Sequence, residues 1–254
     1  TLIAGEGPSL SMLGEGRVDL STIPSDDANL ARRAADRLAR SAGRVNDVVI
    51  RLEKSIPPGT GLGGGSSDAA ATLLALDQLW GLNRSPEQLI PIATAIGSDV
   101  PFFLKPGSAV IRGRGERIQR LDASWRGRVV LILPPYGIST EAVYRTGSQG
   151  RPSVSGGEQS ESHGDAPWSD PSLKAASLMP RLFNDLESAA FRVEPRLAHL
   201  HSMLDGLRGC AVRMTGSGSG LFTLFDDESD AEAWRRAARA LLPPDVIIRV
   251  AVVC

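Results

Sequence analysis

Residues 57–68 read Pro57-Pro58-Gly59-Thr60-Gly61-Leu62-Gly63-Gly64-Gly65-Ser66-Ser67-Asp68. Five of the seven residues from Gly59 to Gly65 are glycine, whereas a tight turn needs only about one or two. The alternating stretch Val48–Glu53 precedes this loop and predicts a strand, and the alanine- and leucine-rich stretch Ala69–Trp80 follows it and predicts a helix. The expected order is therefore a strand, a glycine-rich loop and a helix.

A loop of this kind forms an anion site for simple physical reasons. The first N–H groups of a helix have no acceptor inside the helix, and the helix dipole places partial positive charge there. Glycines let the backbone approach a phosphate closely and adopt left-handed angles at little cost. Ser66 and Ser67 add hydroxyl groups suited to phosphate oxygens or to a magnesium ion. We interpret residues 57–67 as a nucleotide-phosphate site, with a tight turn that binds nothing as the alternative.

Several well-known motifs do not match this loop. A Walker A loop needs lysine directly after its last glycine, and here Ser66 follows Gly65. The dinucleotide pattern G-x-G-x-x-G fits poorly, because Gly61-Leu62-Gly63 is followed by two more glycines and then by serine. The hydrolase pattern G-x-S-x-G is not found at Ser66, Ser67, Ser217 or Ser219. P-loop NTPases and serine hydrolases of that type are therefore excluded.

Composition limits the possible partners. The 28 Lys and Arg residues and 29 Asp and Glu residues give a net charge of −1, which disfavours nucleic acid as a general partner. Hydrophobic residues make up 42% of the chain, enough for a core, yet no apolar run approaches the roughly 20 residues of a membrane helix. Only two cysteines occur, Cys210 and Cys254, so a disulfide scaffold is excluded and a reducing, cytoplasmic setting is expected.

The first half of the chain contains three further local signals. A helix is predicted over Asn29–Ala42, with Gly43 ending it. Ser85-Pro86-Glu87-Gln88 has the pattern of a capping box and begins a helix expected to end at Gly97. Residues 107–118 are predicted to form a hairpin that turns near Gly113 or Gly115.

The second half has a different order of elements. Strands are predicted over Val129–Leu133, Ala211–Thr215, Leu221–Phe225 and Val246–Val253. Helices are predicted to begin at Ser139 and to cover Leu182–Phe191, Glu194–Leu207 and Asp230–Leu242, the last capped by Ser229. This order is βαββαβ, as in ferredoxin-like domains. We therefore expect an α+β protein of two domains, 1–125 and 126–254, with a mobile loop over residues 146–171.

Three segments together resemble the ordered motifs of one enzyme family, the GHMP kinases. They are Pro57–Ala71, Gly97-Ser98-Asp99-Val100-Pro101-Phe102-Phe103, and Met214–Gly220. The extra glycine in Gly-Leu-Gly-Gly-Gly-Ser-Ser-Asp-Ala-Ala is similar to the loop of those members that act on a cytidine-diphosphate-linked methylerythritol in the methylerythritol phosphate route to isoprenoids. The resemblance extends in register from Asn29 to Val252, except for residues 146–171.

The resemblance implies an ATP-dependent kinase that uses Mg²⁺ and phosphorylates a hydroxyl of that small molecule, as a monomer or homodimer. It implies that Asp99 is the catalytic base, that Asn29 contacts adenine, and that residues 216–220 form a second glycine loop buttressing the site. The residues implied to wrap the ATP phosphates are Pro57, Pro58, Gly59, Thr60, Gly61, Leu62, Gly63, Gly64, Gly65, Ser66 and Ser67. The fold implied is an ATP-binding domain followed by a ferredoxin-like domain.

The sequence departs from the family pattern in two ways. Ala28 interrupts the usual Asp-Asn-Leu around Asn29. A catalytic lysine from an N-terminal strand, and a nearby Gly-Tyr-His segment, cannot be located after Thr1. We therefore expect about fifty further residues upstream, on the scale of a small α/β unit. Two alternatives to the expected activity are a non-catalytic nucleotide-binding fragment and another GHMP small-molecule kinase, such as homoserine or mevalonate kinase.

Overall fold

The computed structural model describes residues 2–4, 8–14, 18–113, 115–121, 125–148, 170 and 172–253. These residues form two compact units: the first is Thr1–Pro58 with Gly63–Leu121, and the second is Gly59–Leu62 with Asp122–Cys254. The sequence-based division at residue 125 places the whole glycine loop in the first domain, whereas four residues of that loop belong to the second unit. The loop is thus divided between the two units.

The sheet of the first unit has three strands in the order β1-β3-β2. Strand β3 (Val48–Lys54) is central and confirms the prediction for this stretch. Strand β1 (Leu2–Ala4) pairs with it antiparallel, and β2 (Ser9–Gly14) pairs with it parallel. Strand β2 was not predicted, because its pairing partner lies more than thirty residues away along the chain and its own sequence is weakly patterned.

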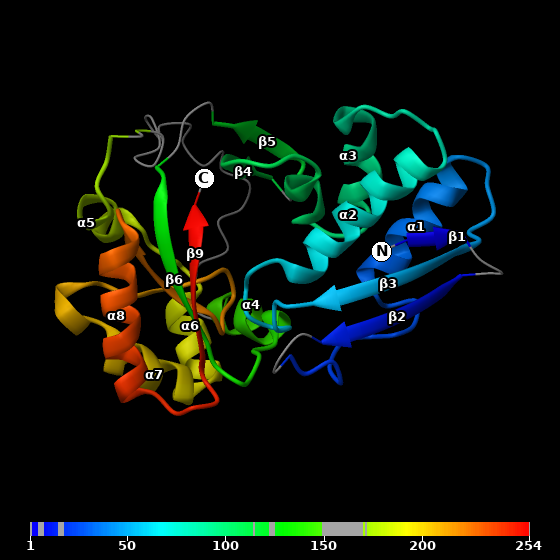
Figure 1. Ribbon diagram of the computed structural model, residues 1–254. Helices are drawn as coiled ribbons and strands as arrows, with labels where there is room; N and C mark the ends of the chain where they lie inside the picture. Colours follow the sequence, from blue (N-terminus) through cyan, green and yellow to red (C-terminus); the bar gives the residue numbers. More distant parts are fainter. Residues whose placement is uncertain are drawn as a thin grey trace. The chain divides into compact units, whose positions relative to one another are not determined.

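Two helices, α1 (Leu30–Ser41) and α2 (Gly64–Leu79), pack against each other along this sheet (Figure 1). Helix α1 confirms the prediction for this region, and its inward face is made of alanines and Leu38 that are almost fully buried. Helix α3 (Pro86–Thr94) has the predicted capping box: Ser85 Oγ accepts from the Gln88 N–H, and Gln88 Oε1 accepts from the Ser85 N–H. It ends at Thr94, three residues before the predicted Gly97.

A short 3₁₀ helix and a hairpin complete the first unit. The 3₁₀ helix η1 covers Val100–Leu104, and strands β4 (Ala109–Arg112) and β5 (Arg117–Arg120) confirm the predicted hairpin. Gly115 has φ +106°, and a Cβ atom there would lie 1.9 Å from the carbonyl oxygen of Ser98. The end of the hairpin turn therefore packs backbone to backbone against the segment that leads into η1.

The second unit contains a four-stranded sheet in the order β7-β8-β6-β9, with every pair antiparallel. Its strands are β6 (Gly127–Leu133), β7 (Arg213–Met214), β8 (Leu221–Phe225) and β9 (Ile247–Val253). Its helical elements are α4 (Thr140–Ser148), α5 (Ala175–Leu178), η3 (Met179–Arg181), α6 (Glu187–Val193), α7 (Pro195–Leu204), η4 (Leu207–Gly209) and α8 (Glu228–Leu241). The order of strands and helices confirms the ferredoxin-like α+β prediction.

Several predicted boundaries in this unit are wrong. Helix α6 begins at Glu187, not Leu182, and α5 was not predicted. Helix α8 begins at Glu228 and is capped by Asp227, whose Oδ1 accepts from the Asp230 N–H, so Ser229 is not the cap. An ionised carboxylate is a stronger partner for a helix N-terminus than a hydroxyl, which explains the earlier start. Helix α4 takes residues 146–148 from the predicted loop; residues 149–169 and 171 lie outside the described part.

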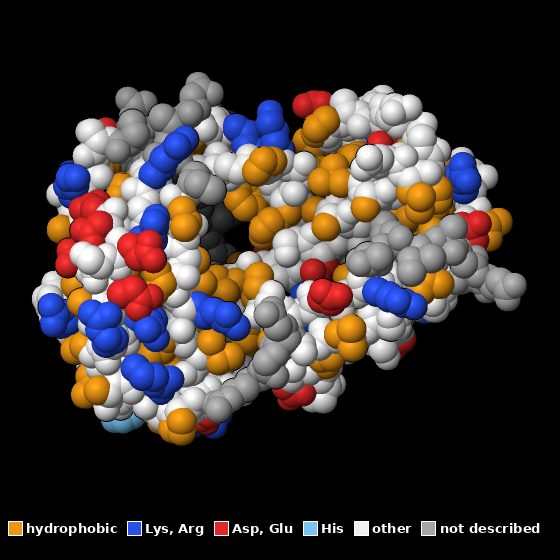
Figure 2. All heavy atoms as spheres, viewed as in Figure 1, with side chains coloured by type: hydrophobic (Ala, Val, Ile, Leu, Met, Phe, Trp, Pro, Cys, Tyr) orange, Lys and Arg blue, Asp and Glu red, His pale blue; other side chains and the backbone are white. Residues whose placement is uncertain are grey.

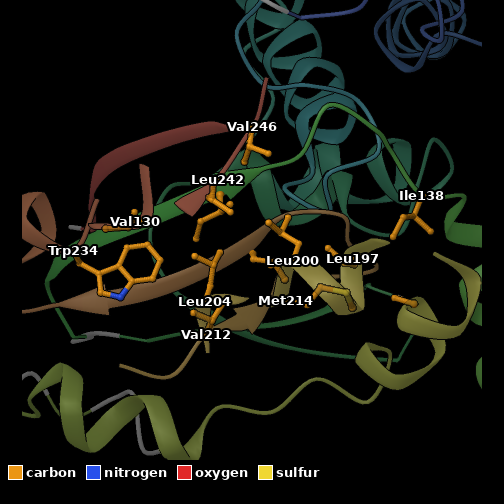
Figure 3. Close-up of a cluster of buried hydrophobic side chains, with 14 of the residues drawn as sticks. Val130, Ile138, Leu197, Leu200, Leu204, Val212, Met214, Trp234, Leu242 and Val246 are labelled. Atoms are coloured by element: carbon orange, nitrogen blue, oxygen red, sulfur yellow. The ribbon is translucent and has the colours of Figure 1, made fainter. Parts of the chain in front are cut away.

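The core of the second unit lies on one face of its sheet, beneath α7 and α8. Figure 3 shows side chains from β6, α7, β7 and α8 meeting there, with Trp234 of α8 at one end. Trp234 is fully buried, and its indole N–H donates to the carbonyl oxygen of Leu207 at 3.1 Å. A smaller cluster of Trp125, Ala175 and Leu178 packs against the other face through Leu224. One face of this sheet therefore carries the main core, and the other is covered in part.

Candidate functional site

Helix α2 begins inside the glycine-rich stretch. It starts at Gly64, five residues before the predicted Ala69, and Gly63 precedes it with φ +69° and ψ 22°. Glycine and serine are poor helix formers, so sequence propensity delays the expected start. Gly63 has no Cβ and adopts this left-handed conformation at little cost, which lets the chain enter the helix early.

The start of α2 has no side-chain cap. Helices α1, α3, α7 and α8 each have a side chain that accepts from a backbone N–H of the first turn, whereas α2 has none, like the shorter helices α5 and α6. The Ser67 N–H donates to Gly63 O at 2.8 Å. The N–H groups of Gly64, Gly65 and Ser66 lie before it and have no acceptor within the helix. An anion placed at this end would accept from them and would also interact favourably with the helix dipole.

The two serines at this helix start have different environments. Ser67 Oγ donates to Gly64 O at 2.8 Å and is used inside the first turn. The Ser66 hydroxyl makes no hydrogen bond with any residue in the described part of the chain and is half-buried. Ser66 is thus the hydroxyl that remains available to a ligand.

Three side chains of the first unit surround the start of α2. A Cβ atom at Gly63 would lie 2.7 Å from Cζ of Phe103 in η1, and one at Gly65 would lie 3.5 Å from Leu30 at the start of α1. A Cβ atom at Gly64 would lie 3.3 Å from Ile56. A side chain at Gly63 would therefore collide with Phe103, whereas one at Gly65 would make only ordinary contact with Leu30.

The other half of the loop is held within the second unit by hydrogen bonds to its carbonyl groups. Gly59 O accepts from the N–H groups of Ile138 at 3.3 Å and Ser219 at 2.8 Å. Thr60 O accepts from the Gly220 N–H at 3.1 Å and from Thr215 Oγ1 at 2.6 Å. The first glycine loop therefore contacts the second glycine loop, residues 216–220, and Thr215 just before it.

The two loops approach so closely that each needs glycine. A Cβ atom at Gly61 would lie 2.1 Å from Thr215 O, and Gly61 has φ +69°. On the second loop, a Cβ atom at Gly216 would lie 2.8 Å from Gly61 O, and one at Gly220 would lie 2.7 Å from Thr60 O. Close packing alone therefore explains why these two positions are glycine, without any ligand.

Polar side chains support the second loop from outside. Asn184 Nδ2 donates to Met214 O at 3.0 Å and to Gly216 O at 2.7 Å. Ser219 is fully buried, and its Oγ donates to Tyr136 O at 2.6 Å. The hydroxyl oxygens of Thr140 and Ser217 lie 2.9 Å apart. Sequence reasoning missed Asn184, Tyr136 and Thr140, since none of them lies in a recognisable pattern.

Tyr136 is itself held by a charged neighbour. The guanidinium carbon of Arg196 lies 4.2 Å from the centre of the Tyr136 ring, in a cation–π contact. Burial raises the pKa of the Tyr136 phenol, and the negative charge of Glu194 adds to that effect. The phenol therefore stays neutral at ordinary pH and serves to anchor the segment that accepts from Ser219.

Asp99 lies immediately before η1 and is exposed. Its side chain does not cap η1, and it forms no hydrogen bond or ion pair with the described residues. Neither of two common structural roles for such an aspartate, a helix cap or an ion-pair partner, is therefore observed for Asp99 among the described residues. Its backbone is nonetheless well fixed, because the Val100 N–H donates to Gly97 O at 3.2 Å and Val100 is fully buried.

Asn29 is the N-cap of α1 and is only 6% exposed. Its Oδ1 accepts from the Ala31 N–H at 2.9 Å, and its Nδ2 donates to Pro24 O at 2.8 Å and contacts Met12 Sδ at 3.9 Å. Both amide hydrogens are thus used, whereas the oxygen keeps one free acceptor position. The adenine contact stays a prediction and depends on that remaining position.

The described residues contain neither a cluster of metal-ligating side chains nor a membrane-spanning helix. No group of three or more His, Cys, Asp or Glu side chains within the described ranges could hold a metal ion. None of the helices described here is long and apolar enough to cross a membrane.

Comparison with known proteins matches both units. The family described as GHMP kinases N terminal domain matches residues 29–107, and GHMP kinases C terminal matches residues 171–243. A 4-diphosphocytidyl-2-C-methyl-D-erythritol kinase of Pelotomaculum thermopropionicum is 37% identical over 87% of this chain and 74% of its own length. The protein of the same name from Rhodococcus jostii is 39% identical over 87% of this chain and 70% of its own length.

Solved structures of GHMP kinases also match this chain. A crystal structure of 4-(cytidine 5'-diphospho)-2C-methyl-D-erythritol kinase has a TM-score of 0.64 and 33% identity, covering 99% of this chain and 83% of the other. A homoserine kinase from Cytophaga hutchinsonii has a TM-score of 0.66 at 18% identity, covering 99% of this chain and 83% of the other, which shows the shared fold. The fold and the matches define an ATP-dependent kinase, a transferase that acts on a small molecule. The chain belongs to the GHMP kinases.

The contact between the two glycine loops gives a prediction for stability. Replacing Gly61 with alanine forces Cβ against the Thr215 carbonyl in a left-handed conformation. We expect Gly61→Ala to lower the free energy of unfolding by about 1–3 kcal/mol more than Gly206→Ala. Gly206 is a matched control, because it has φ +81° in the same unit and nothing within 4 Å of an added Cβ. Equal losses in urea unfolding would show that the loops separate freely.

Proposed function

We propose that this chain transfers the γ-phosphoryl group of ATP to a hydroxyl of 4-diphosphocytidyl-2-C-methyl-D-erythritol, a step in the methylerythritol phosphate route to isoprenoids. The support is the name shared by relatives that are 33–39% identical to this chain. Homoserine and mevalonate kinases resemble it only in fold, at 18% and 15% identity in the two structures compared. Those two activities are therefore the weaker candidates.

The observation that carries the nucleotide site is the uncapped start of α2. The N–H groups of Gly64, Gly65 and Ser66 lie together without helix acceptors, and no side chain caps them. We propose that these N–H groups bind the ATP phosphates and that the preceding residues, Pro57 to Gly63, wrap them. A tight turn that binds nothing needs only about one or two glycines, whereas residues 59–65 contain five.

Mg²⁺ is proposed to enter with ATP. Magnesium is usually held by substrate phosphates, waters and one or two protein oxygens, so a dedicated cluster of carboxylates is not needed. The Ser66 hydroxyl fits this role because it lies at the proposed phosphate site and has no partner in the described part of the chain. Mg²⁺ would supply neutralisation of the phosphate charge.

Asp99 is proposed as the general base. It would accept the proton of the substrate hydroxyl as that oxygen bonds to the γ-phosphorus, while the bond to the bridging oxygen of ADP breaks. An exposed, unpaired carboxylate on a fixed backbone suits this task, because it can reach a substrate without first breaking an ion pair. Asn29 is proposed to contact adenine through its remaining acceptor position.

The proposed setting is the cytoplasm, with a monomer or homodimer and no nucleic-acid partner. Figure 2 shows Lys and Arg side chains lying among Asp and Glu side chains on the face of the second unit around α8, without one broad basic field. Nucleic-acid binding depends on such fields, and the net charge of −1 offers no excess to build one.

A substrate panel tests the proposed acceptor. With ATP and Mg²⁺, we expect the chain to phosphorylate the cytidine-diphosphate-linked methylerythritol and to leave homoserine and mevalonate unchanged. The acceptors are compared by the rate of ADP release with each one. Mass spectrometry follows the phosphorylated product. Preference for homoserine or mevalonate would replace the proposed substrate, and ATP binding without any transfer would leave only a nucleotide-binding protein.

Gly63→Val tests the phosphate site. Valine at φ +69° would place Cβ 2.7 Å from Phe103 and shift the N–H groups that follow it. We expect ATP affinity, measured by calorimetry, to fall at least tenfold, or about 1.4 kcal/mol. Gly81→Val is the matched control, because Gly81 has φ +64° and open space around an added Cβ. Unchanged ATP affinity in folded Gly63→Val would rule out phosphate binding here.

Asp99→Asn tests the base. Asparagine keeps the shape of aspartate but cannot take the proton, so we expect ATP affinity to be retained and turnover to fall by roughly 10²–10⁴-fold. Steady-state turnover and calorimetry on the same preparation separate the two effects. A variant with near wild-type turnover would show that Asp99 is not the base.

A further inference from the structure

One ion pair lies at the two ends of the glycine loop. Lys54 is the last residue of β3 and is only 5% exposed. Its Nζ pairs with Oδ2 of Asp68, in the second turn of α2, and the Asp68 side chain is 24% exposed. Both residues belong to the first unit. The pair therefore joins the strand that enters the loop to the helix that leaves it.

The pair is buried where a lysine alone would be unfavourable. A Cβ atom at Gly64 would lie 3.6 Å from Lys54 Nζ, which places the ammonium beside the positive end of α2. A buried charge without a partner is strongly destabilising, so Asp68 is what makes this position possible for Lys54. Lys54 in turn neutralises a carboxylate that would otherwise repel a phosphate at the same helix start.

Another ion pair of the first unit shows the difference. Arg32 Nε and Asp27 Oδ1 lie 2.7 Å apart, but the Asp27 side chain is 83% exposed. Exposed pairs of this kind contribute little, because water and salt screen them.

Asp68 also lines a cavity of about 650 Å³ beside β3 and α2, so its substitution by asparagine introduces no crowding.

We propose that the Lys54–Asp68 ion pair is a clasp that closes the base of the glycine loop and so strengthens ATP binding, with both residues acting as positioning residues. The inference rests on the proposed function, since the loop must bind ATP phosphates. A loop whose ends are tied loses less conformational entropy when it orders around a ligand, and preorganisation of this kind raises affinity. The clasp acts on the phosphate part of the nucleotide and not on the base.

The test compares ATP with adenosine by calorimetry. We expect Asp68→Asn and Lys54→Met each to weaken ATP binding by about tenfold while adenosine affinity changes by less than about twofold. The double variant should bind ATP no more weakly than the poorer single variant, because both substitutions remove the same contact. Additive losses would mean that the two side chains act on ATP separately, which overturns the clasp.

Two control variants separate the clasp from general stability and from surface charge. Leu38→Ala removes a fully buried side chain of the same unit and lowers the melting temperature without touching the loop ends. Asp27→Asn removes an exposed ion pair. Both should retain ATP affinity. An ATP loss in Leu38→Ala that matches Asp68→Asn at equal destabilisation would overturn the clasp.

The remaining outcomes separate a failure of the clasp from a failure of the proposed function on which it rests. A wild-type chain that binds no ATP would overturn the proposed function and the clasp with it. A wild-type chain that binds ATP, alongside folded Asp68→Asn with the same affinity, would overturn the clasp alone. Because Asp68→Asn keeps the shape of the side chain, it gives this answer even if Lys54→Met fails to fold.

Discussion

The site depends on backbone packing between two glycine loops. Carbonyl groups of Gly59 and Thr60 accept five hydrogen bonds within the second unit, among them the 2.6 Å contact from Thr215 Oγ1. Three of the five come from Ser219 and Gly220 of the second loop, residues 216–220, which approaches so closely that a Cβ atom on either side would collide. Residues 59–62 of the glycine-rich loop therefore pack as part of the second unit, whereas the strand before the loop and the helix after it belong to the first.

This contact divides the polar groups of the loop into two sets. The carbonyl groups of Gly59 and Thr60 are satisfied inside the protein, whereas the N–H groups at the start of α2 are not. Gly65 is exposed and Gly64 and Ser66 are half-buried, so either water or an anion can supply acceptors to these N–H groups. The partial positive charge at the helix start favours an anion there. This backbone preference does not depend on any charged side chain.

Local chemistry made much of this predictable from sequence. The side chains of Ser85 and Gln88 each accept from the backbone N–H of the other residue, and both partners lie within one turn, so this helix start was predicted correctly. The glycine-rich stretch was recognised, but its helix start was not, because glycine and serine are poor helix formers and the left-handed conformation of Gly63 cannot be read from propensity. Strand β2 and the support that Asn184 gives the second loop depend on partners distant in the chain. Propensity and spacing contain no information on such contacts.

The structure gives two aspartates of the first unit opposite environments. Asp68 is paired with a buried lysine at the start of α2, where it is held in one position. Asp99 is exposed and unpaired among the described residues, while Val100 and Phe103 fix the segment behind it. A carboxylate paired with a buried lysine is held in one place, because separating the two would leave the buried charge without a partner. An exposed and unpaired carboxylate has no such constraint and can meet a ligand directly. The two environments therefore fit the different roles proposed above, with Asp68 holding the ends of the loop and Asp99 facing the substrate.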